Sequence, residues 1–171
     1  SLSGQISLLE KYNIDFIEVG IPFSDPLADG PTIQKTSEIA INNGMNLPLL
    51  FEQLRIIETK TPLVLMGYLN PVLNFGIERF VLSCKECGIA SVILPDMSLE
   101  IYERFYQSIF EEHQLPVSFL ITPHTEVSRI QKIAKQCENS FVYLVSSNST
   151  TGTGAKLDLN NKRLKSIYDL M

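Results

Sequence analysis

Residues 15–34 read DFIEVGIPFSDPLADGPTIQ, and the interpretation of the whole chain begins from this stretch. The run up to Gly20 is largely apolar and predicts a short strand. The residues that follow hold two Asp, three Pro and one Gly, a composition typical of a loop. Glu18 interrupts the apolar run, and burial of a carboxylate raises its pKa because desolvation disfavours the charged form. Such a group suits general acid–base chemistry near neutral pH, although a solvated strand end would explain Glu18 equally well.

The bulk composition predicts a soluble, cytoplasmic protein with a single domain over residues 1–171. The formal net charge of −5 and the pI near 5.0 argue against nucleic acid as a partner, because phosphate binding relies on clusters of Lys and Arg. No apolar run approaches the ~20 residues that span a bilayer. A basic and then apolar leader is not expected at the N-terminus either.

The cysteines and histidines do not predict a metal site or a disulfide framework. The three cysteines are an odd count. Cys84 and Cys87 form a C-x-x-C, but they lie in an amphipathic stretch and are expected to face the core. The two histidines, His113 and His124, are isolated in the sequence, so a zinc site is not predicted.

Apolar residues alternate between strand and helix periodicity along the chain. Strands are expected at 14–20, 62–68, 90–96, 117–122 and 141–147. Helical spacing is found between them, with an additional helix expected at 33–41. Gly88 is placed to end one helix and Ser98 to cap the next. This alternation predicts right-handed βαβ units and a parallel sheet.

Polar residues gather where the predicted strands end, and this edge carries the chemistry in α/β folds. They include Glu18, Tyr68, Asp96 and Ser146. Five strands are fewer than the eight of a complete TIM barrel of about 250 residues. Two architectures therefore stay open from the pattern, part of a TIM barrel and a flavodoxin-like open sheet.

The opening stretch resembles the signature of the tryptophan synthase alpha subunit family, E-x-G-x-P-F-S-D-P followed by x-A-D-G-P-x-I-Q. The matching residues are Glu18, Gly20, Pro22, Phe23, Ser24, Asp25, Pro26, Ala28, Asp29, Gly30, Pro31, Ile33 and Gln34. So many identities in one short window make the resemblance specific. It implies an α/β fold, the (β/α)8 TIM barrel, of which this chain would cover about the second to the sixth βα unit.

The resemblance also implies an activity. Members of this family are lyases of tryptophan biosynthesis that cleave indole-3-glycerol phosphate to indole and glyceraldehyde 3-phosphate in a retro-aldol reaction. Glu18 matches the family's catalytic glutamate, which shuttles protons. Asp29 matches the aspartate that accepts a hydrogen bond from the indole N–H. The two carboxylates would have different environments and different roles.

Segments further along the chain resemble the family at lower specificity. The run Met66-Gly-Tyr-Leu-Asn-Pro71 resembles M-x-Y-x-N-P. Ile93 matches a position in the pocket wall, and Tyr143 a tyrosine near the substrate, although core packing would explain both. Thr151 and Gly152 match the Thr-Gly of a loop that closes over the substrate. The preceding residues, 147–150, depart from the family pattern, so loop closure is in doubt.

The resemblance further implies a partner, the pyridoxal-phosphate-dependent beta subunit, in a heterotetramer of two alpha and two beta subunits. Pro22, Asp25, Asn70 and Asn74 match positions that face this partner. No cofactor is expected on the present chain, and pyridoxal phosphate is expected on the beta subunit alone.

Two alternatives stay open beside this reading. The five predicted strands do not include the loops after strands seven and eight, where TIM barrels often bind phosphate. The chain could therefore be a non-catalytic module that binds the beta subunit. It could also be another sugar-phosphate lyase or isomerase with a TIM barrel, which the full signature argues against. Whether the encoding frame continues beyond Met171 is a question that the sequence leaves open.

Overall fold

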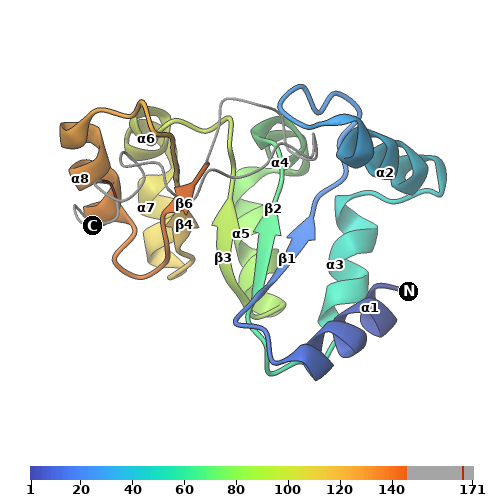
Figure 1. Ribbon diagram of the computed structural model, residues 1–171. Helices are drawn as coiled ribbons and strands as arrows, with labels where there is room; N and C mark the ends of the chain where they lie inside the picture. The colour runs from blue at the N-terminus through green and yellow to red at the C-terminus, as the bar shows by residue number, and fades with distance from the viewer. Residues whose placement is uncertain (146–166, 168–171) are drawn as a thin grey trace.

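The computed structural model describes residues 1–145 and Ile167, which alternate between helices and parallel strands (Figure 1). In chain order the elements are α1 (Leu2–Leu9), η1 (Glu10–Tyr12), β1 (Ile17–Gly20), α2 (Pro31–Asn42), α3 (Leu47–Arg55), β2 (Leu63–Met66), α4 (Leu69–Phe75), α5 (Ile77–Glu86), β3 (Ile89–Ile93), α6 (Leu99–Ile101), the π-helix η2 (Tyr102–Tyr106), α7 (Gln107–Glu112), β4 (Val117–Ser118), β5 (Leu120–Ile121), α8 (Val127–Gln136) and β6 (Tyr143–Leu144).

The described strands pair in parallel and in sequence order. β1, β2, β3 and β4 form one sheet, and β5 pairs with β6. The predicted strand at 117–122 therefore divides at Phe119, whose carbonyl accepts a hydrogen bond of 2.9 Å from Tyr143 N. Its first half, β4, pairs with β3, and its second half, β5, pairs with β6. All five predicted strand segments contain a strand, and their parallel direction is confirmed. Each strand is shorter than predicted.

The hydrophobic core lies between one face of the strands and the helices. Ile17 and Val19 of β1 are buried on this face, while Glu18 and Gly20 alternate onto the other. The largest fully buried side chains from the helices are Phe51, Phe80 and Phe110. Burial of aromatic rings is a large part of what stabilises such a layer, because the free energy gained grows with the apolar area removed from water.

The sheet is strongly curved, as the contact between Phe16 and Phe141 demonstrates. Phe16 directly precedes β1 and Phe141 lies two residues before β6, and their rings stack with centroids 5.1 Å apart. Four strand spacings separate β1 from β6, which in a flat sheet would be roughly 19 Å. Two phenylalanine side chains do not bridge that distance. The contact therefore favours the predicted barrel over a flat, flavodoxin-like sheet.

Two predicted helix boundaries are confirmed. Ser98 Oγ accepts a hydrogen bond of 3.3 Å from Ile101 N at the start of α6. Gly88 follows the end of α5 with φ of +65°, a backbone conformation that favours glycine. α4 was not predicted, because its seven residues follow β2 almost directly and are too few to display a clear helical period.

The cysteines lie against the core as predicted. Cys84 is fully buried, and burial raises the pKa of its thiol. Cys87 is half-buried, and its pKa is raised for the same first reason. Among the described residues, no cluster of three or more metal-binding side chains is found, and no helix has the length and apolar character needed to cross a membrane.

Candidate active site

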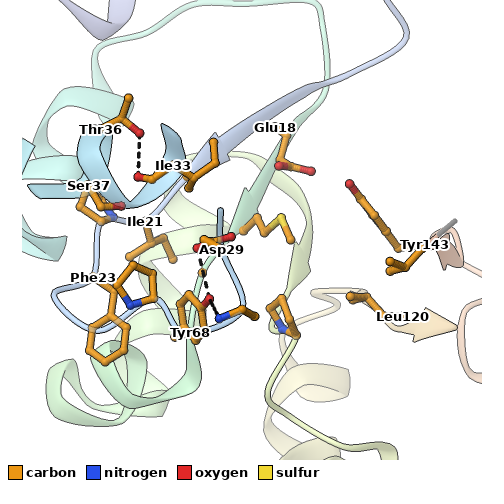
Figure 2. A pocket seen from close by; sticks show the side chains of 18 of the residues that line it. Glu18, Ile21, Phe23, Asp29, Ile33, Thr36, Ser37, Tyr68, Leu120 and Tyr143 are labelled. Atoms are coloured by element: carbon orange, nitrogen blue, oxygen red, sulfur yellow. Dashed lines mark hydrogen bonds between the residues drawn. The ribbon is translucent and has the colours of Figure 1, made fainter. Parts of the chain in front are cut away.

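A pocket of about 690 Å3 opens on the concave face of the sheet, where strand ends and the loop between β1 and α2 come together (Figure 2). Its lining residues are Glu18, Gly20, Ile21, Pro22, Phe23, Pro26, Ala28, Asp29, Ile33, Thr36, Ser37, Ala40, Met66, Gly67, Tyr68, Pro95, Leu120, Thr122, Tyr143 and Val145. They come from both edges of the described sheet, so the curvature of the sheet is what forms the pocket. Most are apolar, and the ionisable side chains among them are Glu18, Asp29, Tyr68 and Tyr143.

Glu18 reaches the pocket because successive side chains of β1 point to opposite faces of the sheet. Its neighbours Ile17 and Val19 point into the core, so the carboxylate points to the concave face. Partial burial raises the pKa of Glu18, and the negative charge of Asp29 raises it further. The direction predicted from the sequence is confirmed. Glu18 is nevertheless exposed rather than enclosed, since this face of the sheet is open to solvent through the pocket.

Asp29 is held at the start of α2 by the residues of the sequence signature. Gly30 has extended backbone as the N-terminal cap, and Pro31 occupies the first helical turn, where its missing N–H costs nothing. Gln34 Nε2 donates a hydrogen bond of 2.9 Å to the Asp29 carbonyl. Tyr68 donates from its hydroxyl to Asp29 Oδ2 at 3.1 Å. The signature Asp-Gly-Pro-x-x-Gln thus fixes the backbone that presents the carboxylate.

Tyr143 lies across the pocket from Glu18. Figure 2 shows the phenol of Tyr143 and the carboxylate of Glu18 pointing toward each other from opposite walls. Burial raises the pKa of Tyr143, and the charge of Glu18 raises it further. Tyr143 is therefore a neutral phenol that could donate to Glu18 or to a ligand between them.

Of the other residues predicted to bind substrate, the structure describes Ile93 alone. Ile93 does not line the pocket, because it is fully buried in β3 beside its register partner Met66, which does line it. Its assignment as a substrate contact remains a prediction. Thr151 and Gly152 lie outside the described residues.

The residues predicted to face a partner lie on two neighbouring segments. Pro22 is half-buried and Asp25 is exposed in the loop after β1, while Asn70 and Asn74 are exposed on α4. A ring contact shows that the two segments are adjacent. The ring centroid of Phe23, in the loop after β1, lies 5.3 Å from that of Tyr68 at the start of α4.

Two parts of the site were not predicted. One is the hydrogen bond between Tyr68 and Asp29, which are 39 positions apart. The other is the pocket face of α2, formed by Ile33, Thr36, Ser37 and Ala40. Their spacing of three, four and seven residues places them on one face of a helix. That spacing was available in the sequence, but nothing local indicated that the face lines a pocket.

Comparison with known proteins agrees with the resemblance. The sequence profile of the tryptophan synthase alpha chain family matches residues 2–169. The tryptophan synthase alpha chain of Flavobacterium psychrophilum is 51% identical over 152 residues, which are 88% of this chain and 60% of the relative. That of Bacteroides thetaiotaomicron is 47% identical over 170 residues, which are 96% of this chain and 65% of the relative.

Solved structures extend the agreement to the fold. Tryptophan synthase of Mycobacterium tuberculosis superposes with a TM-score of 0.83 and 28% identity, over 99% of this chain and 65% of that chain. The tryptophan synthase complex of Pyrococcus furiosus superposes with a TM-score of 0.79 and 32% identity, over 95% of this chain and 66% of that chain. The chain spans about three fifths to two thirds of the length of these proteins.

The predicted fold is thereby confirmed, since the similar structures are TIM barrels and the described strands form a curved part of one. The range that the profile matches, residues 2–169, includes all the residues that line the pocket. This chain belongs to the tryptophan synthase alpha chain family.

Proposed function

We propose that the protein carrying this chain cleaves indole-3-glycerol phosphate to indole and glyceraldehyde 3-phosphate. The observation that carries the proposal is that Glu18 and Asp29 line one pocket, where partial burial raises the pKa of Glu18 and the charge of Asp29 raises it further. A glutamate with a raised pKa can hold and release a proton near neutral pH, as a proton shuttle must.

The reaction assigns different tasks to the two carboxylates. Cleavage breaks the bond between the indole ring carbon and the glycerol side chain. Glu18 would deliver a proton to the ring carbon and take one from the glycerol hydroxyl, which becomes the aldehyde. Asp29 would accept a hydrogen bond from the ring N–H and stabilise positive charge that develops there. Protons and electrons balance between these groups, so the proposal assigns no cofactor to this chain.

The pocket suits a bicyclic aromatic ligand. Its volume of about 690 Å3 is within the range of about 300–1,000 Å3 that is usual for small-molecule sites. Ile21, Phe23 and Ile33 provide apolar walls, and few polar groups converge on the space between them. This combination supports binding of an indole ring, whose two faces are apolar and whose N–H is the one strong donor.

We further propose that Pro22, Asp25, Asn70 and Asn74 contact the beta subunit, which would hold pyridoxal phosphate. Their support is that they lie on two adjacent segments beside the pocket, with Asp25 and both asparagines exposed. The similar protein of Pyrococcus furiosus was also solved as a tryptophan synthase complex. We also propose a cytoplasmic location, which is where the proposed biosynthetic role would be carried out.

Turnover of indole-3-glycerol phosphate by the full protein tests the proposed reaction. Glu18→Gln keeps the shape of the side chain but cannot shuttle a proton, so kcat should fall by roughly 10²–10⁴. Glu52→Gln, at an exposed position of α3, is the matched control and should turn over at the parent rate. Parent-like turnover by Glu18→Gln would show that the proton shuttle is another residue.

A second assay separates the enzyme from a binding module. The parent protein is added to a tryptophan synthase beta subunit, and the rate of the beta subunit is measured. Stimulation of the beta subunit without any cleavage of indole-3-glycerol phosphate would contradict the proposed reaction and support a non-catalytic role.

A further inference from the structure

The hydrogen bonds of Tyr68 fix the direction of its single proton. A tyrosine hydroxyl has one hydrogen to donate and can also accept. The backbone N–H of Ala28 donates to the Tyr68 hydroxyl at 3.0 Å, which uses its capacity to accept. The ionised carboxylate of Asp29 can only accept, so the proton of Tyr68 points to Asp29 Oδ2, 3.1 Å away. Tyr68 thus bridges the backbone and the side chain of adjacent residues in one loop.

The ring that carries this hydroxyl is itself held in place. Phe23 packs beside it with ring centroids 5.3 Å apart. The next residue, Leu69, donates its backbone N–H to both carboxylate oxygens of Asp96, at 2.8 and 3.1 Å. Burial raises the pKa of Tyr68, and the charges of Asp29 and Asp96 add to this, so the phenol stays protonated at neutral pH. The Tyr68 hydroxyl therefore keeps its proton at neutral pH. Its position is fixed by the ring of Phe23 and by the bond between Leu69 and Asp96.

The two oxygens of Asp29 differ as a result. Oδ2 is engaged by Tyr68, whereas Oδ1 receives no hydrogen bond from the residues that the structure describes. Asp29 lines the pocket together with apolar side chains. A ligand N–H that enters the pocket would find one carboxylate oxygen ready to accept it, without rotation of the side chain.

We propose that Tyr68 is a positioning residue, which holds the Asp29 carboxylate so that the pocket selects aromatic ligands that carry a ring N–H. The proposal rests on the proposed role of Asp29 as the partner of the indole nitrogen. It adds that selectivity for the N–H depends on a residue that does not contact that nitrogen. Pre-organisation of this kind improves binding because the ligand does not have to order the acceptor.

Binding of indole and of benzofuran to the full protein tests this proposal without any turnover. Benzofuran has the same bicyclic shape, with an oxygen in place of the N–H. Titration calorimetry gives both dissociation constants. The parent protein should prefer indole by roughly tenfold or more, since a hydrogen bond to a charged acceptor is at stake. In Tyr68→Phe, which keeps the ring beside Phe23, this preference should fall by about threefold or more while benzofuran binds as before.

Two further variants make the result specific. Tyr12 lies in η1, ahead of β1, and is 72% exposed. The control variant Tyr12→Phe removes its hydroxyl and should leave the preference for indole unchanged. Asp29→Asn should lower the preference by itself. Addition of Tyr68→Phe to Asp29→Asn should then change little, because Tyr68 acts through Asp29.

The outcomes distinguish this inference from the proposed reaction. An unchanged or larger preference in Tyr68→Phe overturns the inference, and so does equal weakening of both ligands, which would mean that Tyr68 only shapes the pocket. Benzofuran binding shows in the same experiment that the pocket is folded. If the parent cleaves indole-3-glycerol phosphate but Tyr68→Phe keeps the preference, the inference alone fails. If the parent does not cleave it but the preference falls, the proposed reaction alone fails.

Discussion

The backbone N–H of Leu69 donates to both carboxylate oxygens of Asp96, at 2.8 and 3.1 Å. Leu69 is the first residue of α4, and Asp96 follows β3, so the contact joins two successive βα units. The residue before α4, Tyr68, does not cap the helix with its own side chain. The cap is instead provided by the neighbouring unit, and its negative charge also suits the positive end of the helix dipole.

Replacement of Asp96 by alanine should therefore destabilise the protein by about 0.5–2 kcal/mol, the usual cost of a lost N-terminal cap. Asp96→Asn keeps one accepting oxygen and should cost less. Urea unfolding of both variants measures these differences. Asp15→Ala, at an exposed position before β1, is the control and should cost little. Equal stability of Asp96→Ala and the parent would mean that α4 starts without this cap.

Replacement of Asp29 by asparagine should lower the pKa of Glu18. The negative charge of Asp29 is one of two causes that raise this pKa, and Asp29→Asn removes it. The pKa should stay above its ordinary value, because burial of Glu18 is the larger cause. Carbon-13 NMR titration of the Glu18 carboxyl, assigned with Glu18→Gln, gives the pKa in both proteins. A higher pKa in Asp29→Asn would contradict the arrangement described above.

Glu18→Gln should make the protein slightly more stable at neutral pH. The pKa of Glu18 is raised above the ordinary value of 4.5, so the folded state binds its proton more tightly than the unfolded state does. This contribution is fully present below pH 4.5 and is lost as the pH rises through the folded pKa. Glutamine does not ionise and avoids the loss.

The gain should be less than about 1 kcal/mol, because the carboxylate is accessible to solvent. Thermal unfolding of parent and variant at pH 4 and at pH 7 measures it, and the difference between them should be larger at pH 7. Glu52→Gln should show no such dependence on pH. A Glu18→Gln variant that is less stable than the parent at pH 7 would mean that the ionised carboxylate has a stabilising partner.

The sequence was sufficient for the parts of the fold that depend on local pattern. Strand and helix periods located the βα units, and the residues from Glu18 to Gln34 identified the two pocket carboxylates. Alternation along β1 is enough to place Glu18 opposite the core-facing Ile17 and Val19.

What the sequence did not predict depends on distances between remote segments. The segment at 117–122 divides because its two halves pair with different neighbours, β3 and β6, which no local period reveals. Tyr68 was expected at the same edge as Glu18, but its hydrogen bond to Asp29 requires the loop after β1 to fold back over the end of β2. Ile93 was expected in the pocket wall; it is fully buried beside its register partner Met66, which lines the pocket, and its role stays a prediction.

Gly67→Ala should destabilise the protein, because β1 and β2 approach each other closely where they end. A Cβ at Gly67 would lie 2.6 Å from Cβ of Ile21, and it would also lie close to the outer carbons of that side chain. Gly67 N donates to the Ile93 carbonyl at 3.1 Å, so the backbone cannot move away without loss of this bond. Overpacking of this kind costs about 1–3 kcal/mol.

Gly20→Ala is the matched control for Gly67→Ala. Gly20 is the last residue of β1, and a Cβ there would meet nothing within 4 Å. Urea unfolding should therefore give a large loss of stability for Gly67→Ala and a small change for Gly20→Ala. Equal stability of the two variants would mean that β1 and β2 can separate at this end. The pocket walls formed by Ile21 and Tyr68 would then be less rigid than the contact between Gly67 and Ile21 indicates.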